Sequence, residues 1–565
     1  MKAKMTVLTL IVLITLLSLP AGYPAQGTVQ VGHERHVLPS YVEPNTPGAP
    51  GVTVDPALAA AITDPAAFDA DGSLNLNKAI YTRFFDRNRT APPEAILVHI
   101  PGVVAGSNSF RIVASEIVRL SGGRFEVWAM DRRSNLMEDL MPMIAAENAN
   151  TRGASLAALN AYLNNPAGPG GYIAANPFSV SSSMAEWGVD VHLRDVRTVV
   201  DQAHTVTPNV FLGGHSIGAI LTQMFAAYNF GGVVGFQLVK GIIILDGTAD
   251  PSGLGAPAAS DEIYLNGGDT ALGTVVGLRH LRMPTAPSHA PYLIDPFNPV
   301  LFQLVEIGSQ LALIDPDGPS VLRQVVPSLV PVPATNAAAL AINLDDEFQE
   351  QIFARFSIGF LRVPAGGSAT DVATRMDDPS AANPNGLWRP RDLGATLQQW
   401  APLKDLGSLG FPSRPEPSDF QTVARSFLVG AGNQTAAIGD TNSLEWYFPN
   451  RLVLDISKVI DLGRAPLSAQ VIAEQMARGG NRITLTENSR VNVPLLAIRT
   501  AEGGLVPTNL AFLLYRQSTS IPSSRLTVRT MDNYAHVDVL TSLERRSSQN
   551  KNVPEFIFDF IQANR

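Results

Sequence analysis

The stretch "NVFLGGHSIGAILTQMFAAYNF", residues 209–230, decides the fold. It starts with a short apolar run, Asn209–Leu212, that is typical of a β-strand, and it ends in a pattern typical of a helix. Between the two, Gly214-His215-Ser216-Ile217-Gly218 has the form G-x-S-x-G. In a nucleophile elbow the serine adopts a strained backbone conformation at the end of a strand, and small flanking residues let the following helix pack closely. Ser216 is therefore a candidate nucleophile.

Similar strand-and-helix units lie on both sides of this stretch. Their apolar runs are continuous rather than alternating, which is typical of parallel strands buried on both faces. We therefore predict an α/β fold, with a mainly parallel sheet and helices on both of its faces. An earlier, more alternating run predicts one antiparallel strand. The parallel runs are "AILVHIPG" (95–102), "FEVWAMD" (125–131), "VKGIIILDG" (239–247), "VNVPLLAIRT" (491–500) and "RLTVRTM" (525–531), and the antiparallel one is "NLNKAIYTRFFD" (75–86).

The repeat of strands and helices is interrupted once, over a long interval. Residues 251–490 mix proline-rich loops with helical patches, and we predict that they form a large, mostly helical cap or lid inserted into the core. The core then consists of residues 76–250 and 491–565. Residues 26–75 are rich in proline, glycine and alanine, and we expect them to lie over the surface as an N-terminal segment.

The N-terminus has the pattern of a secretory signal peptide. Lys2 and Lys4 precede an apolar run from Met5 to Leu19, and small residues follow up to Ala25. The run is short for a membrane span, and no later segment is long and apolar enough. Residues 1–25 thus predict a secreted or periplasmic protein without a stable membrane span after cleavage.

Composition narrows the possible partners. The chain has 565 residues, a formal net charge of −9 and no cysteine. This charge argues against a nucleic-acid partner, and the absence of cysteine excludes disulfides and cysteine nucleophiles. The histidines lack metal-ligand spacing, and no glycine-rich nucleotide loop follows a strand, so we expect no metal site and no cofactor.

A nucleophilic serine needs a base and an oxyanion hole. Catalytic groups of open α/β sheets lie on loops at the carboxyl ends of the strands. Of nine histidines, only His536 follows the last predicted strand, which makes it the candidate base. His215 and His99 are interpreted as structural. The oxyanion donors are expected to be the backbone N–H of Ile217 and that of Gly102 or Val103.

The strand, the G-H-S-x-G motif, the helix and the late histidine together resemble the α/β-hydrolase superfamily over about 90–250 and 490–565. Within it, "HIPG", "VWAMDRRSNLMEDL", "GGHSIGA" and "AHVDVL" are similar to capped lipases and esterases. The resemblance implies an exported serine hydrolase that cleaves small-molecule or lipid carboxylic esters through an acyl-enzyme. The alternatives are a serine peptidase or thioesterase of the same fold, and a secreted binding protein without catalytic activity.

The resemblance leaves two candidates for the triad acid. The superfamily often carries Gly-x-x-Asp-x-x-Val-Pro after its seventh strand. Counted back from Val506-Pro507, that position holds Gly503, with Glu502 one place earlier. The other candidate is Asp246, at the end of the strand after the serine helix. Asp538 is interpreted as a loop-orienting group.

Two further stretches carry weaker predictions. In "MDRRSNLMED" (130–139), we expect Arg132 and Arg133 to pair with Glu138 and Asp139 rather than with a substrate carboxylate. "LEWYFPNRLVLD" (444–455) is strongly aromatic, and it predicts either a pocket lining or packing inside the cap.

Overall fold

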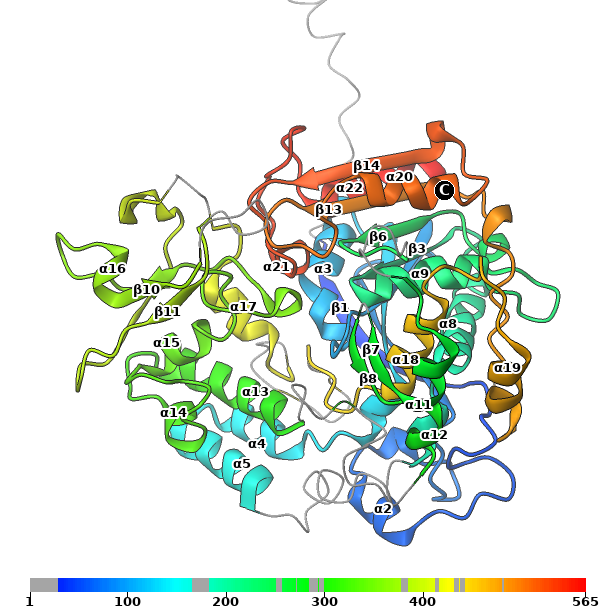
Figure 1. Ribbon diagram of the computed structural model, residues 1–565, viewed down its shortest axis with the longest axis horizontal. Helices are drawn as coiled ribbons and strands as arrows, with labels where there is room; N and C mark the ends of the chain where they lie inside the picture. The colour runs from blue at the N-terminus through cyan, green and yellow to red at the C-terminus, as the bar shows by residue number, and fades with distance from the viewer. Residues whose placement is uncertain are drawn as a thin grey trace, which may run out of the picture.

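An eight-stranded sheet forms the centre of the molecule (Figure 1). The computed structural model describes residues 29–164, 182–249, 257–270, 272–283, 293, 299–377, 385–411, 416–430, 436, 440, 443–479 and 482–565. In sheet order the strands are β1 (Val31–Pro39), β2 (Lys78–Asp86), β4 (Phe125–Asp131), β3 (Ala95–Ile100), β5 (Val210–His215), β6 (Ile242–Leu245), β13 (Leu495–Thr500) and β14 (Leu526–Met531).

The sheet is parallel except where β2 meets its neighbours. β2 runs antiparallel to both β1 and β4, and the six strands from β4 to β14 are mutually parallel. The predicted mainly parallel sheet and its early antiparallel strand are thus confirmed. Residues 31–39, expected within a surface-lying segment, form the edge strand β1, which pairs with β2 along its whole length. The polar sequence "HERH" in this strand hides the alternation that would have indicated it.

Helices cover both faces of the sheet, as predicted. Neighbouring residues of one strand face opposite sides, so that Leu97 of β3 packs in one core and Val98 in the other. The core around Leu97 is closed by α3 (Arg111–Leu120), α21 (Asp538–Thr541) and α22 (Val553–Asn564). The core around Val98 is closed by α8 (Val189–His204), α9 (Ile217–Ala227) and α20 (Leu510–Gln517).

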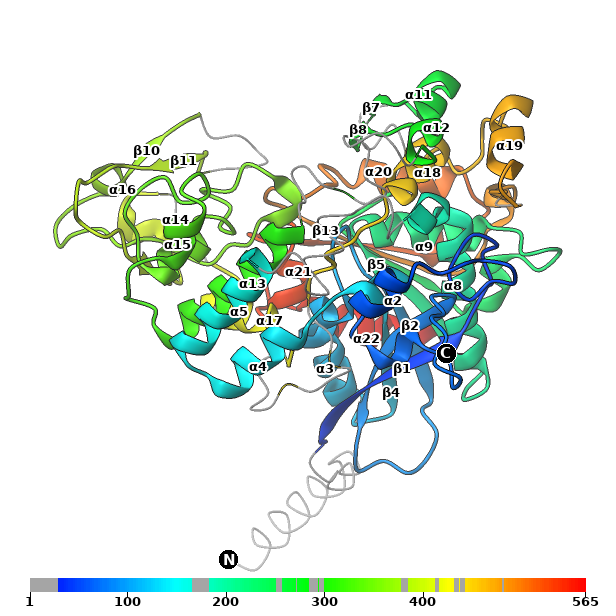
Figure 2. The ribbon, with the colours of Figure 1, turned by 90° about the horizontal axis from the view of Figure 1, so that it is seen from below.

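The long interruption of the sheet, residues 251–490, is called the insertion below, and its described residues fall into two groups. One group lies beside α8 and α9, and the other forms a lobe at the opposite side (Figures 1 and 2). The first contains α11 (Asp261–Asn266), β7 (Gly268–Thr270), β8 (Gly273–Val275), α12 (Leu278–Leu281), α18 (Asn450–Val459) and α19 (Ala469–Met476). The lobe contains α13 (Pro299–Ile314), α14 (Val321–Val325), α15 (Asn336–Ala341), β9 (Phe360–Leu361), α16 (Ala369–Val372), β10 (Ala373–Arg375), β11 (Trp388–Pro390), β12 (Trp400–Ala401) and α17 (Phe420–Ser426).

Part of the lobe comes from the core sequence rather than the insertion. Helices α4 (Met141–Ala149) and α5 (Arg152–Asn164) pack against α13, so two separate segments build the lobe. A further short helix, α2 (Pro56–Ala61), lies in the N-terminal segment. The predicted signal peptide, residues 1–25, lies outside the described residues. No helix in the part of the chain that the structure describes has the length and apolar character needed to cross a membrane.

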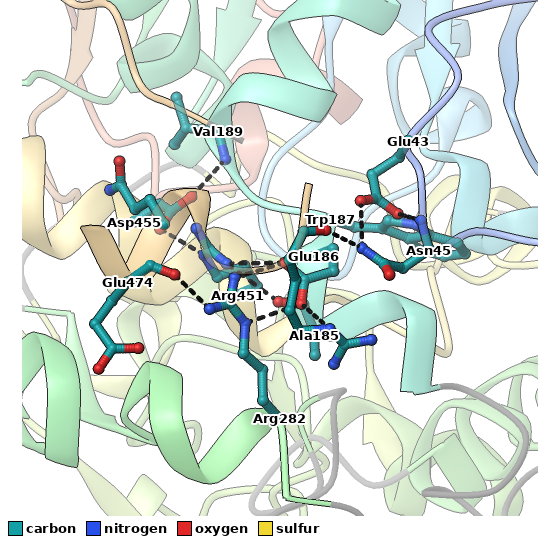
Figure 3. Close-up of polar contacts among 12 residues, drawn as sticks. Glu43, Asn45, Ala185, Glu186, Trp187, Val189, Arg282, Arg451, Asp455 and Glu474 are labelled. Carbon is teal, nitrogen blue, oxygen red and sulfur yellow. Dashed lines mark hydrogen bonds and ion pairs between the residues drawn. The ribbon is translucent and has the colours of Figure 1, made fainter. Parts of the chain in front are cut away.

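A buried ionic network fixes the first group of the insertion to the core (Figure 3). Arg451 of α18 lies between Asp455, at 2.7 Å from Nε to Oδ1, and Glu186 of the core. Asp455 also accepts a hydrogen bond from the first N–H of α8, on Val189, at 3.0 Å. This carboxylate therefore serves as the N-cap that Gly188, lacking a side chain, does not provide.

Candidate active site

Ser216 occupies the sharp turn between β5 and α9. Its φ of 56° and ψ of −123° are strained for a residue with a side chain, and its N–H donates to Leu245 O of β6 at 2.9 Å. A Cβ on Gly218 would lie 2.2 Å from Ile100 O, and one on Gly214 would lie 2.2 Å from Gly218 O. The two glycines are thus required for the close approach of helix and strands that the elbow needs.

His536, 290 residues from Asp246 in sequence, is hydrogen-bonded to that carboxylate, with 2.6 Å between Nδ1 and Oδ2. Both side chains are fully buried. Asp246 accepts further hydrogen bonds from Thr500 N at 3.3 Å and Leu505 N at 3.0 Å. Burial alone would raise the pKa of Asp246, but the hydrogen bond and charge of His536 outweigh it and lower that pKa. Asp246 is thus held ionised against the imidazole.

Glu502, the other candidate acid, does not take this position. Its backbone N–H donates to Tyr534 O at 3.1 Å, and no hydrogen bond or ion pair between Glu502 and His536 is observed among the described residues. Asp538 orients the loop around His536, as its position suggested, because it accepts hydrogen bonds from Ala535 N at 2.7 Å and Ser418 Oγ at 2.6 Å.

Ser216 and His536 line one cavity of about 340 Å³. In the described part of the chain, no hydrogen bond joins His536 Nε2 to Ser216 Oγ. Such contacts between nucleophile and base are often long without a substrate and shorten when one binds. Gly102 and Val103 also line the cavity, and a Cβ on Gly102 would lie 3.3 Å from Ser216 Cβ.

Most of the cavity wall comes from the insertion, and it is apolar. Among the described residues, no Lys, Arg, Asp or Glu lines the cavity. The polar side chain of Asn343 is already bound to Leu329 O and Ala339 O, and that of Ser426 to Val423 O. The insertion contributes Leu301, Phe302, Leu304, Val305, Leu322, Leu329, Leu340, Leu344, Phe353, Phe356, Phe427 and Leu444 to this wall.

The aromatic stretch 444–455 fulfils both of the roles expected for it. Leu444 lines the cavity, whereas Trp446, Tyr447 and Phe448 are almost fully buried in the core. Trp446 packs edge-on against Tyr162 of α5, with 5.5 Å between ring centroids. Trp446 therefore packs against α5 of the lobe, and none of the three aromatic rings lines the cavity.

The predicted pairing of Arg132 and Arg133 with Glu138 and Asp139 is wrong. Arg132 Nη1 lies 2.6 Å from Glu445 Oε2 of the insertion, and Arg133 binds Asp195 of α8 through two nitrogens, at 2.9 and 2.6 Å. Glu138 accepts the N–H of Trp446. Asp139 accepts the hydroxyl of Thr63. Local sequence spacing misled here because both arginines pair with carboxylates from distant segments of the chain.

Two further histidines, His215 and His99, are buried near the site, and neither is hydrogen-bonded to Ser216 among the described residues. His215 Nε2 contacts the backbone oxygen of His536 at 3.0 Å, and burial lowers the pKa of His215 to about 3. The ring of His99 stacks on Phe110, with 3.5 Å between centroids, and burial lowers its pKa well below the ordinary value. Burial therefore keeps both imidazoles neutral at physiological pH, and the structural role that the sequence assigns to them stays a prediction.

One group of acidic side chains elsewhere has the spacing of metal ligands. Asp345, Asp346, Glu347 and Glu416 are buried in the lobe, and each offers an oxygen within 4.8 Å of the others. Asp345 and Glu416 also accept backbone N–H groups, of Ile358 and Gly359 at 3.2 Å. These hydrogen bonds give the acidic residues a structural role within the lobe, and we assign no ion to them.

Comparisons with known proteins give only distant likenesses. No protein-family model matches the sequence, and no curated protein matches it. Solved structures that it resembles include a lipase candidate from Sulfolobus solfataricus, with 11% identity and a TM-score of 0.40 over 96% of this chain and 98% of that one. A peroxisomal alpha-beta-hydrolase from Saccharomyces cerevisiae has 8% identity and a TM-score of 0.34 over 95% of this chain and 89% of that one. An epoxide hydrolase from Vigna radiata has 11% identity and a TM-score of 0.32 over 86% of this chain and 95% of that one.

The fold itself is assigned from the chain's own geometry. A mainly parallel sheet is covered by helices on both faces, and a strained serine stands between a central strand and its helix. A carboxylate and a histidine follow in that order along the chain and meet at the carboxyl edge of the same sheet. The protein has the α/β-hydrolase fold.

Proposed function

We propose that the protein is an exported serine hydrolase that cleaves carboxylic esters through an acyl-enzyme on Ser216. The observation that carries the proposal is the buried hydrogen bond between His536 and Asp246 beside a strained serine. A serine hydroxyl needs a base whose tautomer is fixed, and a buried carboxylate on Nδ1 leaves Nε2 to accept the proton.

In the proposed reaction, His536 takes the hydroxyl proton of Ser216 while Oγ attacks the ester carbonyl. The oxyanion that forms is bound by the N–H of Ile217, at the positive end of α9, and by the N–H of Gly102 or Val103. His536 then gives its proton to the leaving alcohol. A water, deprotonated by the same histidine, attacks the acyl-enzyme and releases the acid, which restores Ser216.

The cavity supports an uncharged, apolar acyl group. Its described lining is mainly aliphatic and aromatic with a minority of polar side chains such as Gln349 and Gln351, and it contains no Lys, Arg, Asp or Glu that could pair with an ionic substrate. A pocket of about 300–1,000 Å³ with apolar walls is the usual size for a small-molecule ligand. A lipid-like ester fits this mainly apolar lining better than a peptide, because a peptide would have to bury more amide groups against it at a cost in free energy.

The test is hydrolysis of p-nitrophenyl esters from acetate to palmitate by the protein and by Ser216→Ala. We expect activity that the variant lacks and that rises from acetate to longer acyl chains. No difference between protein and variant would favour a secreted binding protein. Cleavage of thioesters or peptides, but not of oxygen esters, would instead assign one of the other hydrolase reactions.

Export is proposed from the N-terminal sequence alone. The N-terminal sequence of protein recovered outside the cytoplasm is expected to begin between residues 22 and 26, after the apolar run that ends at Leu19. Recovery of the intact Met1 terminus would refute cleavage.

A further inference from the structure

We propose that Arg132 is a positioning residue for the oxyanion loop, residues 101–106, and that Glu445 of the insertion holds Arg132 in place. The catalytic consequence of this brace rests on the proposed function, whereas the brace itself does not. Arg132 and Glu445 form a buried ion pair that joins the end of β4 to the insertion. Arg132 is 3% exposed and Glu445 is fully buried.

The guanidinium of Arg132 binds the loop on one side and the insertion on the other. Its Nη2 donates to the carbonyl oxygens of Pro101 and Gly102, both at 2.9 Å. Its Nη1 donates to Glu445 Oε2 at 2.6 Å, and Ser134 Oγ donates to the other carboxylate oxygen. A planar, rigid fork can hold several acceptors in one geometry, which a lysine ammonium cannot.

These two carbonyl contacts fix where the loop N–H groups point. In a trans peptide the C=O and the N–H lie in one plane and point in opposite directions. Fixing Pro101 O and Gly102 O on Arg132 therefore turns the N–H groups of Gly102 and Val103 away from it. Gly102 and Val103 line the cavity with Ser216, whereas Arg132 does not. In the described part of the chain, neither of the two N–H groups has a hydrogen-bond acceptor.

The next residue of the loop is strained and is held by the same segment of the insertion. Val104 has a φ of 46°, a left-handed conformation that is unfavourable for a β-branched side chain. Its carbonyl accepts the N–H of Glu445 at 2.9 Å, and the N–H of Gly106 donates to Ser443 O at 3.0 Å. Strain of this kind persists only where the surroundings impose it.

Residues 443–445 therefore act on the oxyanion loop in two ways. They pair with its backbone at Val104 and Gly106, and through the Glu445 carboxylate they orient the guanidinium that holds Pro101 and Gly102. The same insertion builds most of the cavity wall. Formation of the acyl cavity and alignment of the oxyanion donors are thus coupled through one buried ion pair.

The kinetic test compares Arg132→Lys and Glu445→Gln with Arg133→Lys. Arg133 is the matched control, because it is the adjacent residue, is equally buried and is paired with Asp195, but does not touch the loop. Misplaced oxyanion donors are expected to lower kcat by about 10- to 100-fold while KM changes by about twofold or less. Equal losses of kcat in the Arg132 and Arg133 variants, or a loss confined to KM, would overturn the catalytic role.

Hydrogen exchange tests the brace independently of any activity. The amides of Gly106 and Glu445 report the pairing of loop and insertion, and both are expected to exchange faster in Arg132→Lys and Glu445→Gln but not in Arg133→Lys. Unchanged exchange in the first two variants would overturn the brace. Faster exchange in a protein that hydrolyses no ester would support the brace and refute the proposed function, so the two failures are distinguishable.

Discussion

Replacing Asp246 by asparagine tests the arrangement of the site most directly. Both carboxylate oxygens of Asp246 accept hydrogen bonds. Oδ2 accepts from His536 Nδ1, Leu505 N and Thr500 Oγ1, and Oδ1 accepts from Thr500 N. An asparagine must place its NH₂ group at one of these two positions. If the NH₂ faces His536, Nδ1 must become the acceptor and the ring proton moves to Nε2, which can then no longer take a proton from Ser216.

The size of the effect follows from this exchange of donor and acceptor. In the serine hydrolase template, the same substitution lowers kcat by about 10⁴-fold, which corresponds to about 5 kcal/mol of transition-state stabilisation. The opposite amide orientation, with the NH₂ against Thr500 N–H, preserves the tautomer but leaves a buried clash of donors that costs about 1–3 kcal/mol of stability. Because the first orientation points its NH₂ group at the N–H of Leu505, either orientation leaves a clash of donors; we therefore expect a measurable loss of stability together with the large loss of kcat.

The assay is kcat for the best p-nitrophenyl ester, with the folded fraction of each variant measured by circular dichroism. Glu502→Gln is the matched control, since this carboxylate was the alternative acid and no hydrogen bond or ion pair joins it to His536 among the described residues. We expect Glu502→Gln to change kcat by less than about tenfold. A loss of similar size in both variants, or an Asp246→Asn enzyme retaining more than about a tenth of its activity, would refute the assigned tautomer.

Three further substitutions test packing and charge. Burial lowers the pKa of His215 to about 3, so between pH 6.5 and 3 the unfolded chain binds this proton more readily than the folded chain, and the free energy of unfolding falls as the pH falls. Urea titrations at several pH values should show that His215→Gln removes up to about 1.4 kcal/mol per pH unit of this dependence. An equal pH dependence in the protein and the variant would contradict the prediction. Gly218→Ala would place a methyl group 2.2 Å from Ile100 O, so the turn must shift and kcat should fall at least about tenfold. A fully active variant would show that the backbone around Ile100 can move without disturbing the site. Asp455→Ala would leave Arg451 buried without its nearest carboxylate and should cost about 3–5 kcal/mol in thermal or denaturant unfolding, whereas an unchanged unfolding midpoint would show that Glu186 alone suffices.

The sequence predicted the central sheet because its strands are buried on both faces. Continuous runs such as "AILVHI" and "IIIL" carry this signal in a few residues. β1 lacked this signal, because a partly exposed edge strand tolerates polar residues such as "HERH" (33–36) as well as apolar ones. The elbow was equally local, since its serine and two glycines lie within five consecutive residues, 214–218, that form one turn.

The choice between Asp246 and Glu502 could not be made from the sequence. Both residues follow strands, β6 and β13, that are neighbours in the sheet, so both lie near the same edge. Which carboxylate reaches His536 depends on the direction of each backbone as it leaves its strand, and Asp246 leaves with a φ of 41°. The partner of Arg132 was equally hidden, because Glu445 is 313 residues away along the chain.

The position of the insertion has a consequence for how the protein acquires its activity during synthesis. Ser216 and Asp246 emerge early, but the histidine that pairs with this carboxylate is 290 residues farther on and docks through the last strand of the sheet. Closing so long a loop adds little to the equilibrium cost, because each doubling of length adds only about 0.6 kcal/mol. It does slow folding, because the entropy of closing the loop is lost before the long-range pairing of parallel strands can stabilise the chain. Under the proposed function, a chain that has already formed its serine elbow would remain inactive until the C-terminal strands join the sheet, so that synthesis of Ser216 precedes its activation by His536.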